Sequence, residues 1–546
     1  MGEAAVQLRA AQRAAHPPAR PCRHRYELDE LYAVNVFDRR TDAGKASPAG
    51  AQHAMEHEAA QQLLPVPRFM PYAKASLVPD SVHYGNETDL QALLAFKAEI
   101  TGDPLGILNS WNKSAHFCQW VGVSCGRRHQ RVTRLNLTNV KLTGSISPHI
   151  GNLSFLMRLR LQNNSLSHNI PQEIGHLRRL EFISLYNNLV TGEIPANISR
   201  CSSLITLEFT RKRLTGKIPT ELGHLSKLQL LYIARNNLTG GVPATIGNLS
   251  SLTYLYIAQN NIDGNIPDGL GRLTNLESFG LAGNMFVGTI PSSLFNISSI
   301  REFDILMNQI QGILPSNLGT LLPNLEFLQV SVNSLIGTIP SSISNATNLY
   351  FLGLDDNNFT GKMPALDKLR NLRKLVASYN HLGTGEAGDL SFLSSLINAT
   401  NLSVLGLAYN GFGGVFPEAI TNFSIRLSYV YLRDNKLYGS IPRGIGNLVN
   451  LQLLGTENNH LTGNIPADFG KLQNLHLLVL GGNRFSGEIP SSFGNLSLLL
   501  TLDLSENNLH GSIPSSLSKC QKLLELKLAK NNLSGTIPKE TYLIIT

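Results

Sequence analysis

Apolar residues recur along this chain with a period of 24 residues that begins at Val132. Residues 228–251, LQLLYIARNNLTGGVPATIGNLSS, form one clean copy. Numbered from the start of each copy, positions 1, 4, 6, 11, 15, 19 and 22 are apolar, which fits neither one helix nor one strand. The pattern predicts a coil that turns once around a core and buries its apolar positions against neighbouring coils.

Seventeen such copies, coils 1–17 below, fill residues 132–546. Positions 3–7 alternate as a short strand, so stacked coils predict a parallel sheet with neighbouring strands about 4.8 Å apart. The expected fold is an α/β-type solenoid, a curved right-handed superhelix with a concave parallel β-sheet. The copies start at residues 132, 156, 180, 204, 228, 252, 276, 300, 325, 349, 372, 402, 427, 451, 475, 499 and 523.

Three further positions that recur within the period, Asn, Gly and Pro, have structural explanations. Asn at position 9, as in Asn164 and Asn236, is expected to point inward and pair with backbone groups of adjacent coils. Gly at position 13, as in Gly216, permits a turn that a side chain would obstruct. Pro at position 16 fixes the backbone where no ladder amide is needed. Departures from this pattern include Lys212 at position 9, His168 at position 13 and Thr456 at the apolar position 6.

A different segment, residues 86–131, precedes the repeats. Cys118 and Cys125 lie close together in CQWVGVSC, which indicates one disulfide-stapled cap and an oxidising compartment. Ahead of them, Thr88 and Gln91 form a capping box for a predicted helix. Its predicted apolar face is Leu90, Leu93, Leu94 and Ile100. Cys201 and Cys520 occupy the apolar position 22 and are interpreted as buried filler.

The repeat pattern LxGxIPxxIGxLxx, with NETDLQALLAFKAEITGDPLGILNSWN and CQWVGVSC before it, resembles plant leucine-rich-repeat receptor-like kinases over residues 86–546. GSISPHIGNLSFL at residues 144–156 and the overlong copy at 372–401 resemble the subfamily of bacterial-pattern immune receptors. The resemblance implies a leucine-rich-repeat solenoid with a helical N-terminal cap that senses a ligand outside the cell. It also implies a shorter leucine-rich-repeat co-receptor kinase as partner. We recognise no C-terminal cap, membrane span or kinase in this sequence.

Charge and N-terminal composition narrow the partners and the compartment. Lys and Arg number 46 against 38 Asp and Glu, and we see no dense basic stripe of the kind that nucleic acid binding requires. Residues 1–85 lack the apolar core of a signal peptide and are interpreted as a disordered or mis-joined extension, with a transit peptide as the alternative. We expect an extracellular location or the outer face of the plasma membrane, with membrane association only through a segment outside this sequence.

Asn-x-Ser/Thr sequons support secretion, since they are the acceptors of N-glycosylation. The candidate glycosylation sites are Asn86, Asn152, Asn197, Asn248, Asn345, Asn401, Asn495 and Asn532.

Two short motifs that mimic enzyme signatures are explained by the repeat. Residues 468–470 spell the kinase triplet Asp-Phe-Gly, but Phe469 falls at the apolar position 19 and no other kinase motif accompanies it. Residues 383–388, GTGEAG, have dinucleotide-binding spacing without the required strand and helix, so we interpret them as a flexible loop. We predict no catalytic residue, no metal site and no cofactor.

Ligand recognition is expected at positions 3, 5, 7 and 8, which the fold leaves free to vary on the concave sheet. Tyr and Arg anchor many peptide interfaces, although exposed Tyr also packs against cross-strand neighbours, and both interpretations remain open. Tyr379 belongs with the second of the two groups expected here. The candidate residues are Arg158, Arg160, Phe182, Tyr186, Arg211, Tyr232, Arg235, Tyr254 and Tyr256, and then Tyr409, Tyr429, Tyr431 and Arg433.

These observations favour a ligand-recognition ectodomain of a plant receptor-like Ser/Thr kinase that senses a peptide or a microbial pattern. Two alternatives remain. One is a soluble secreted leucine-rich-repeat protein of the cell-wall-hydrolase inhibitor type, which is expected to be shorter and to have a second Cys-stapled cap. The other is a non-functional fragment whose last coil exposes apolar surface.

Overall fold

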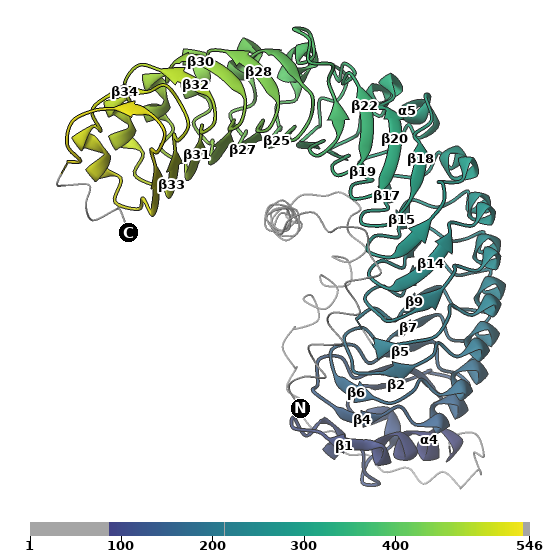
Figure 1. Cartoon of the computed structure of the whole chain (residues 1–546). Helices are drawn as coiled ribbons and strands as arrows, with labels where there is room; N and C mark the ends of the chain where they lie inside the picture. Colours follow the sequence, from purple (N-terminus) through teal and green to yellow (C-terminus); the bar gives the residue numbers. More distant parts are fainter. Residues whose placement is uncertain (1–86, 212, 539–546) are drawn as a thin grey trace, which may run out of the picture. The chain divides into compact units, whose positions relative to one another are not determined.

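Residues 87–211 and 213–538 are described by a computed structural model of the chain. They form the predicted leucine-rich-repeat solenoid, in which one coil stacks on the next and the main sheet lines the inner side (Figure 1). The predicted N-terminal extension, Asn86, Lys212 and the last eight residues lie outside the described part.

The inner sheet follows chain order, because each strand pairs in parallel with the strands of the coils before and after it. Its first strand, β2, is the exception and pairs antiparallel with β3. Most inner strands cover only positions 3–5, so the predicted strand over positions 3–7 is too long. The strands are β2 (Val123–Cys125), β3 (Val132–Asn136), β5 (Arg158–Arg160), β7 (Phe182–Ser184), β9 (Thr206–Glu208), β11 (Leu230–Tyr232), β13 (Tyr254–Tyr256), β15 (Ser278–Gly280), β17 (Glu302–Asp304), β19 (Phe327–Gln329), β21 (Phe351–Gly353), β23 (Lys374–Val376), β25 (Val404–Gly406), β27 (Tyr429–Tyr431), β29 (Leu453–Gly455), β31 (Leu477–Val479), β33 (Thr501–Asp503) and β35 (Glu525–Lys527).

The strand ends early because the backbone turns at position 8. Every position 8 residue in the described coils has a positive φ, from Asn139 at 59° to Lys530 at 56°. The backbone also has a positive φ at position 13, where the residue is usually glycine, as at Gly216 with φ 75°. His168 adopts φ 64° at this position although it has a side chain.

A second set of short strands lies on one flank, in separate small sheets. These sheets are β1 (Ile100–Gly102), β4 (Thr143–Ser145) and β6 (Ser165–Ser167); β8 (Thr191–Gly192) and β10 (Arg213–Leu214); β12 (Thr239–Gly240), β14 (Asn261–Asn265) and β16 (Met285–Val287); β18 (Gln311–Ile313), β20 (Ser334–Thr338), β22 (Asn358–Gly361) and β24 (His381–Leu382); β26 (Gly413–Val415), β28 (Lys436–Gly439), β30 (His460–Asn464) and β32 (Arg484–Ser486); and β34 (His510–Gly511) and β36 (Asn532–Leu533).

The outer side of most coils is a short 3-10 helix that begins after the position 16 proline. Pro195 has φ −67° and Pro219 has φ −63°, the values that the proline ring imposes. The outer helices are η3 (Pro148–Asn152), η4 (Gln172–His176), η5 (Ala196–Arg200), η6 (Thr220–His224), η7 (Ala244–Asn248), η8 (Asp268–Arg272), η9 (Ser292–Asn296), α5 (Leu318–Leu321), η10 (Ser341–Asn345), η11 (Ser391–Asn398), η12 (Glu418–Asn422), η13 (Arg443–Asn447), η14 (Ala467–Lys471), η15 (Ser491–Asn495) and η16 (Ser515–Lys519).

Inside the solenoid, leucine, isoleucine and phenylalanine fill a continuous core, and an asparagine ladder runs along it. Asn260 is typical: its Oδ1 accepts from the Leu238 N–H at 3.1 Å and its Nδ2 donates to the carbonyls of Ile233 and Ile257 at 3.1 and 3.0 Å. The predicted inward pairing of position 9 with adjacent coils is confirmed. At the sites that depart from the pattern, Thr456 Oγ1 is buried and has no hydrogen-bond partner among the described residues.

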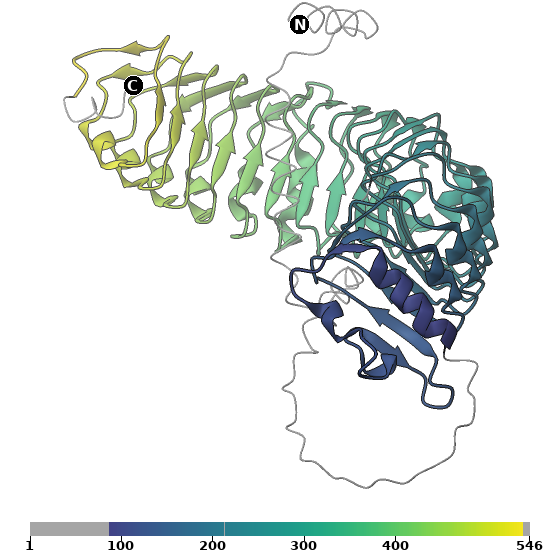
Figure 2. The same cartoon turned by 90° about the horizontal axis from the view of Figure 1, so that it is seen from below.

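The cap begins with α4 (Glu87–Ala98), which packs beside η3, and continues through η1 (Ile107–Ser110) and η2 (Phe117–Gln119) (Figure 2). Cys118 and Cys125 form the expected disulfide. Because the helix already includes Thr88, the predicted capping box is wrong, and Gln91 donates to Glu87 instead. Ile100 lies in β1, outside the predicted helix face.

The buried face of α4 contains a charge that the sequence analysis overlooked. Asp89 is fully buried and accepts hydrogen bonds from Arg131 Nε at 2.9 Å, Arg131 Nη2 at 2.7 Å and the Val132 N–H at 2.8 Å. This carboxylate therefore joins the cap to the first coil.

The overlong copy contains an anchored loop, so the predicted flexible loop at 383–388 is wrong. The buried Asp389 carboxylate accepts from the Thr384 N–H and hydroxyl, and from the N–H groups of Gly385 and Gly413, at 2.8–3.0 Å. Burial alone would raise the pKa of Asp389, but these hydrogen bonds together hold it below its usual value.

Candidate ligand-binding face

The first aromatic group lies on adjacent strands β11 and β13, where Tyr232 and Tyr256 are direct neighbours in register. Their rings stack at 5.4 Å, and Tyr254 lies 6.5 Å from Tyr232. Tyr232 is only 7% exposed, so the prediction that it contacts ligand is wrong for its ring. It supports Tyr254 and Tyr256, which remain half-buried.

Tyr256 is also held from the following coils. Its hydroxyl donates to Glu302 Oε2 at 2.5 Å, and Ser278 Oγ lies 2.7 Å from both oxygens. Burial raises the pKa of Tyr254 above its ordinary value, with Glu277 and Glu302 adding to the shift. Tyr254 therefore stays protonated at neutral pH. Tyr254, Tyr256 and the supporting Tyr232 together form a tyrosine platform on the concave sheet.

The predicted arginines divide between the sheet and its edge. Arg158 and Arg160 lie in β5, and the Arg160 guanidinium sits 4.9 Å from the Phe182 ring centre. Arg211 and Arg235 occupy position 8 with φ 56°, so they lie in the turn and not in the strand as predicted. From that turn Arg211 reaches to 5.7 Å from the Tyr186 ring.

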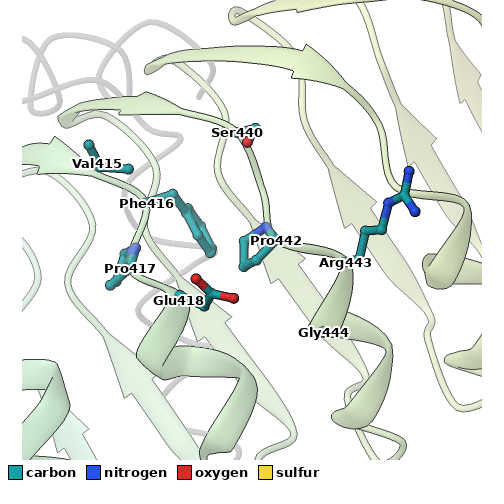
Figure 3. Close-up of a pocket in the computed structure, with 8 residues that line it drawn as sticks. All are labelled: Val415, Phe416, Pro417, Glu418, Ser440, Pro442, Arg443 and Gly444. Carbon is teal, nitrogen blue, oxygen red and sulfur yellow. The ribbon is translucent and has the colours of Figure 1, made fainter.

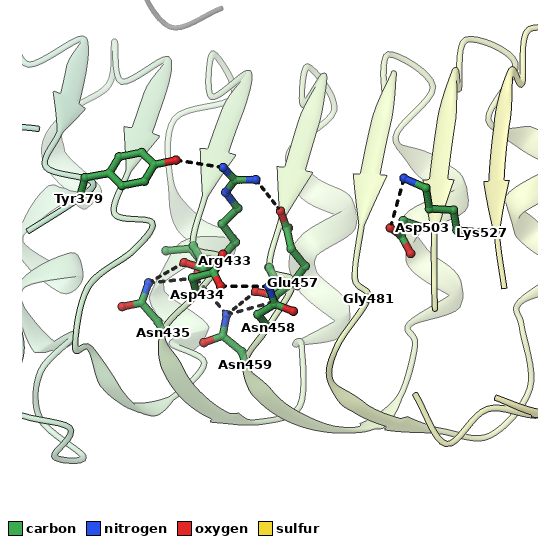
Figure 4. Close-up of polar contacts among 12 residues, drawn as sticks. Tyr379, Arg433, Asp434, Asn435, Glu457, Asn458, Asn459, Gly481, Asp503 and Lys527 are labelled. Carbon is green, nitrogen blue, oxygen red and sulfur yellow. Dashed lines mark hydrogen bonds and ion pairs between the residues drawn. The ribbon is translucent and has the colours of Figure 1, made fainter. Parts of the chain in front are cut away.

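The second aromatic group is tied together by an arginine (Figure 4). Tyr379 and Tyr409 stack at 4.3 Å, and Arg433 lies 4.6 Å from the Tyr409 ring centre. Arg433 also donates to the Tyr379 hydroxyl at 3.1 Å and to Glu457 at 3.3 Å. Burial raises the pKa of Tyr409 to about 12, and nearby Asp434 adds to the shift.

The tyrosines of β27 complete this group at positions 3 and 5 of the next coil. Tyr429 and Tyr431 are both half-buried, and the Tyr429 hydroxyl donates to Gln452 at 2.8 Å. The predicted residues therefore lie in two separate stretches of the sheet, one over coils 2–6 and one over coils 11–13.

An apolar stretch of the concave face, not predicted from the sequence, covers coils 9–12. Positions 3 and 5 carry Phe327, Phe351, Val376 and Val404, all buried although they face away from the core. Phe327 and Phe351 stack at 4.5 Å. The sequence signal for this stretch is the run of apolar residues at positions 3 and 5 of successive coils, positions that face away from the core. The candidate residues were chosen for Tyr and Arg, so the stretch was not among them.

A buried acid, Asp355, lies at position 7 of coil 10, within this stretch. Ser331 donates to its carboxylate, and burial nonetheless raises the pKa of Asp355 to about 6.

The basic residues gather near the start of the repeats, although they form no dense stripe. Residues 127–213 contain thirteen Lys and Arg against four Asp and Glu, whereas the whole chain has a net charge of +8. The first coils are therefore distinctly basic, and the remainder of the chain is close to neutral.

The candidate glycosylation sites mostly face solvent. Asn152, Asn248, Asn345, Asn495 and Asn532 are exposed, Asn197 and Asn401 are half-buried, and Asn86 lies outside the described residues. Their modification stays a prediction.

Other features of the described part offer no enclosed site. A hollow of about 610 Å³ on the flank of coils 12 and 13 is open to solvent and is lined by residues such as Phe416, Glu418 and Arg443 (Figure 3). Phe469 of the kinase-like triplet is fully buried in the core, as its repeat position predicts. Among the residues described, we find no cluster of potential metal ligands and no helix suited to spanning a membrane.

Family models and solved structures match this architecture. Residues 86–126 match the leucine rich repeat N-terminal domain, and residues 226–286, 155–177, 474–496 and 498–520 match leucine rich repeats. The ectodomain of the Arabidopsis receptor kinase HAESA, solved with a peptide hormone, is 30% identical with a TM-score of 0.64, and the alignment covers 84% of this chain and 88% of HAESA's. The chain belongs to the family of plant leucine-rich-repeat receptor kinase ectodomains.

Other members of this receptor family match over shorter segments. The receptor-like kinase EFR of Arabidopsis thaliana is 58% identical over 74 residues, 13% of this chain and 7% of EFR. The receptor kinase-like protein Xa21 of rice, Oryza sativa subsp. japonica, is 45% identical over 87 residues, 16% of this chain and 8% of Xa21. These alignments therefore span less than a tenth of each full-length kinase.

Proposed function

We propose that this chain is an extracellular ligand-recognition ectodomain of a plant receptor-like Ser/Thr kinase, and that it binds a peptide or microbial pattern on its concave sheet. The observation that carries the proposal is the rigid tyrosine platform of Tyr254 and Tyr256. Such groups contribute large contact area at low entropic cost and can still form hydrogen bonds.

The similar structures support this function. HAESA is described in complex with the peptide hormone IDA, and also with the co-receptor SERK1 in a structure 26% identical to this chain. PEPR1, 27% identical with a TM-score of 0.53, is described with AtPEP1. By analogy, a shorter leucine-rich-repeat co-receptor is the second partner we propose. The alignment with HAESA over most of both chains favours the receptor over the shorter secreted inhibitor.

The platform can be tested directly with Tyr254→Ala in the full chain. Binding to a panel of synthetic secreted-plant and bacterial peptides should identify a ligand, and the variant should weaken that ligand by about tenfold or more. Tyr438→Ala is the matched control, because Tyr438 is 42% exposed on the flank strand β28. Equal affinities for the wild type and Tyr254→Ala would remove this platform from the binding site.

A further inference from the structure

The first two coils place arginines side by side on the concave sheet. Arg134 in β3 is the direct register partner of Arg158 in β5, and both occupy position 3 of their coils. Neighbouring strands lie about 4.8 Å apart, and like charges directly opposite each other destabilise a sheet. Repulsion between the two arginines therefore lowers the stability of the first two coils unless a negative charge lies nearby.

Elsewhere on the same face, basic side chains have such compensation from an adjacent coil. Arg433 pairs with Glu457 at 3.3 Å, and Lys530 pairs with Glu506 at 2.6 Å. The repeat therefore readily supplies an acid one coil away from a base.

Arg134 and Arg158 lack this arrangement. Neither forms an ion pair with any residue in 87–211 or 213–538, and strands β2, β3, β5 and β7 contain no acid. At positions 3, 5, 7 and 8 of the following coils, the first acid is Glu208 in β9, which already accepts a hydrogen bond from Ser184 at 2.7 Å. The surrounding residues 127–213 add further positive charge.

We propose that Arg134 and Arg158 form a binding site for an acidic segment of a peptide or protein partner. Two guanidinium groups on neighbouring strands can each bind a carboxylate by donating two charge-assisted hydrogen bonds to its oxygens. Bound carboxylates would supply the negative charge that the coils themselves do not provide.

The neighbouring aromatic residues favour a peptide over an acidic polysaccharide. Phe182 is the register partner of Arg158 on β7, and Tyr186 lies in the same coil. Arginine beside aromatic rings is the composition of peptide and protein hot spots, where apolar contacts accompany the charges. The inference rests on the proposed recognition function and adds that the ligand carries acidic residues toward the N-terminal coils.

The test uses the full chain and a fluorescent heptaglutamate peptide at low ionic strength. Arg134→Gln with Arg158→Gln should weaken binding by about tenfold or more. Lys141→Gln with Lys217→Gln is the matched control, because it removes the same charge from exposed residues of the N-terminal coils away from positions 3, 5, 7 and 8. The control should change binding by less than about twofold.

Three results would overturn the proposal. These are no wild-type binding, equal losses in the two double variants, or an Arg134- and Arg158-dependent preference for oligogalacturonate over heptaglutamate. The arginine variant should keep or raise the melting temperature, which separates lost binding from lost folding. The outcome is independent of Tyr254→Ala, so failure of this site and failure of the proposed receptor function are distinguishable.

Discussion

At the scale of single residues, the asparagine ladder shows how far one repeated side chain can be predicted. Its inward direction follows from polarity and spacing alone. Its redundancy does not: the Ile233 carbonyl accepts from Asn236 as well as from Asn260, at 3.0 and 3.1 Å. If one of these asparagines is lost, the carbonyl still has the other as a hydrogen-bond donor. The backbone N–H that the lost asparagine accepted from has no such second side-chain partner.

Asn260→Ala tests how much one asparagine of the ladder contributes to stability. The Leu238 N–H loses its Asn260 acceptor, so the free energy of unfolding should fall by about 1–3 kcal/mol. Hydrogen exchange should show faster opening around residue 238. Asn261→Ala is the control, because Asn261 is exposed. If the two variants are equally stable, the ladder does not contribute as described.

Asp355 gives a prediction for pH. Its folded-state pKa is about 6 and its ordinary value is 3.8, so the folded protein binds a proton more readily than the unfolded chain. The Asp355 contribution to the free energy of unfolding should therefore increase as pH falls from about 7 toward 4, because the folded state takes up the proton first. The same contribution is lost when pH rises through the folded pKa. In thermal melts across this range, Asp355→Asn should lack this component and Asp356→Asn should retain it. A wild-type profile unchanged by Asp355→Asn would contradict the burial effect.

At the scale of elements, the overlong coil shows where local sequence is insufficient. Glycine-rich residues 383–388 indicate flexibility when considered alone. The acid that anchors them, Asp389, also bonds the Gly413 N–H of the next coil, 24 residues away. That contact exists only once the coils are stacked, so no local pattern could reveal it.

Asp389→Ala should release this loop. The three backbone N–H groups of Thr384, Gly385 and Gly413 all donate to one oxygen, Oδ2 of Asp389, so the substitution removes their shared acceptor. Hydrogen exchange of these three residues should accelerate markedly, with little change in distant coils. Glu386→Gln is the control in the same loop, since the Glu386 side chain is 69% exposed. Slow exchange in Asp389→Ala would show that the loop is held by other contacts.

At the scale of the whole molecule, the sequence predicted the stacked coils, the concave sheet and the cap disulfide, because all three follow from spacing. The candidate site was predicted less well. The positive φ at position 8 was missed because residues as different as Val332 and Asn458 adopt it. The burial of Tyr232 was missed because it depends on the neighbouring ring of Tyr256.

The junction of the cap with coil 1 should control the N-terminal end only. Asp89→Ala leaves Arg131 without its buried partner and should cost about 3–5 kcal/mol locally. Because repeats interact mainly with their neighbours, protection against hydrogen exchange should fall in residues 87–160 and persist in the distal coils. Glu87→Ala, at an exposed position of the same helix, is the control. A uniform loss of protection would mean that the whole solenoid unfolds as one unit.

The flank strands β24 and β26 are not paired, whereas the inner sheet continues through β23 and β25. At this junction the Gly411 N–H donates to the Leu382 carbonyl at 2.7 Å, and the Gly413 N–H donates to the Asp389 carboxylate. The flank of the overlong coil therefore depends in part on one side chain, whereas the inner sheet depends on backbone groups. A substitution in this coil can loosen the flank and leave the concave strands paired, so the recognition surface tolerates sequence change here.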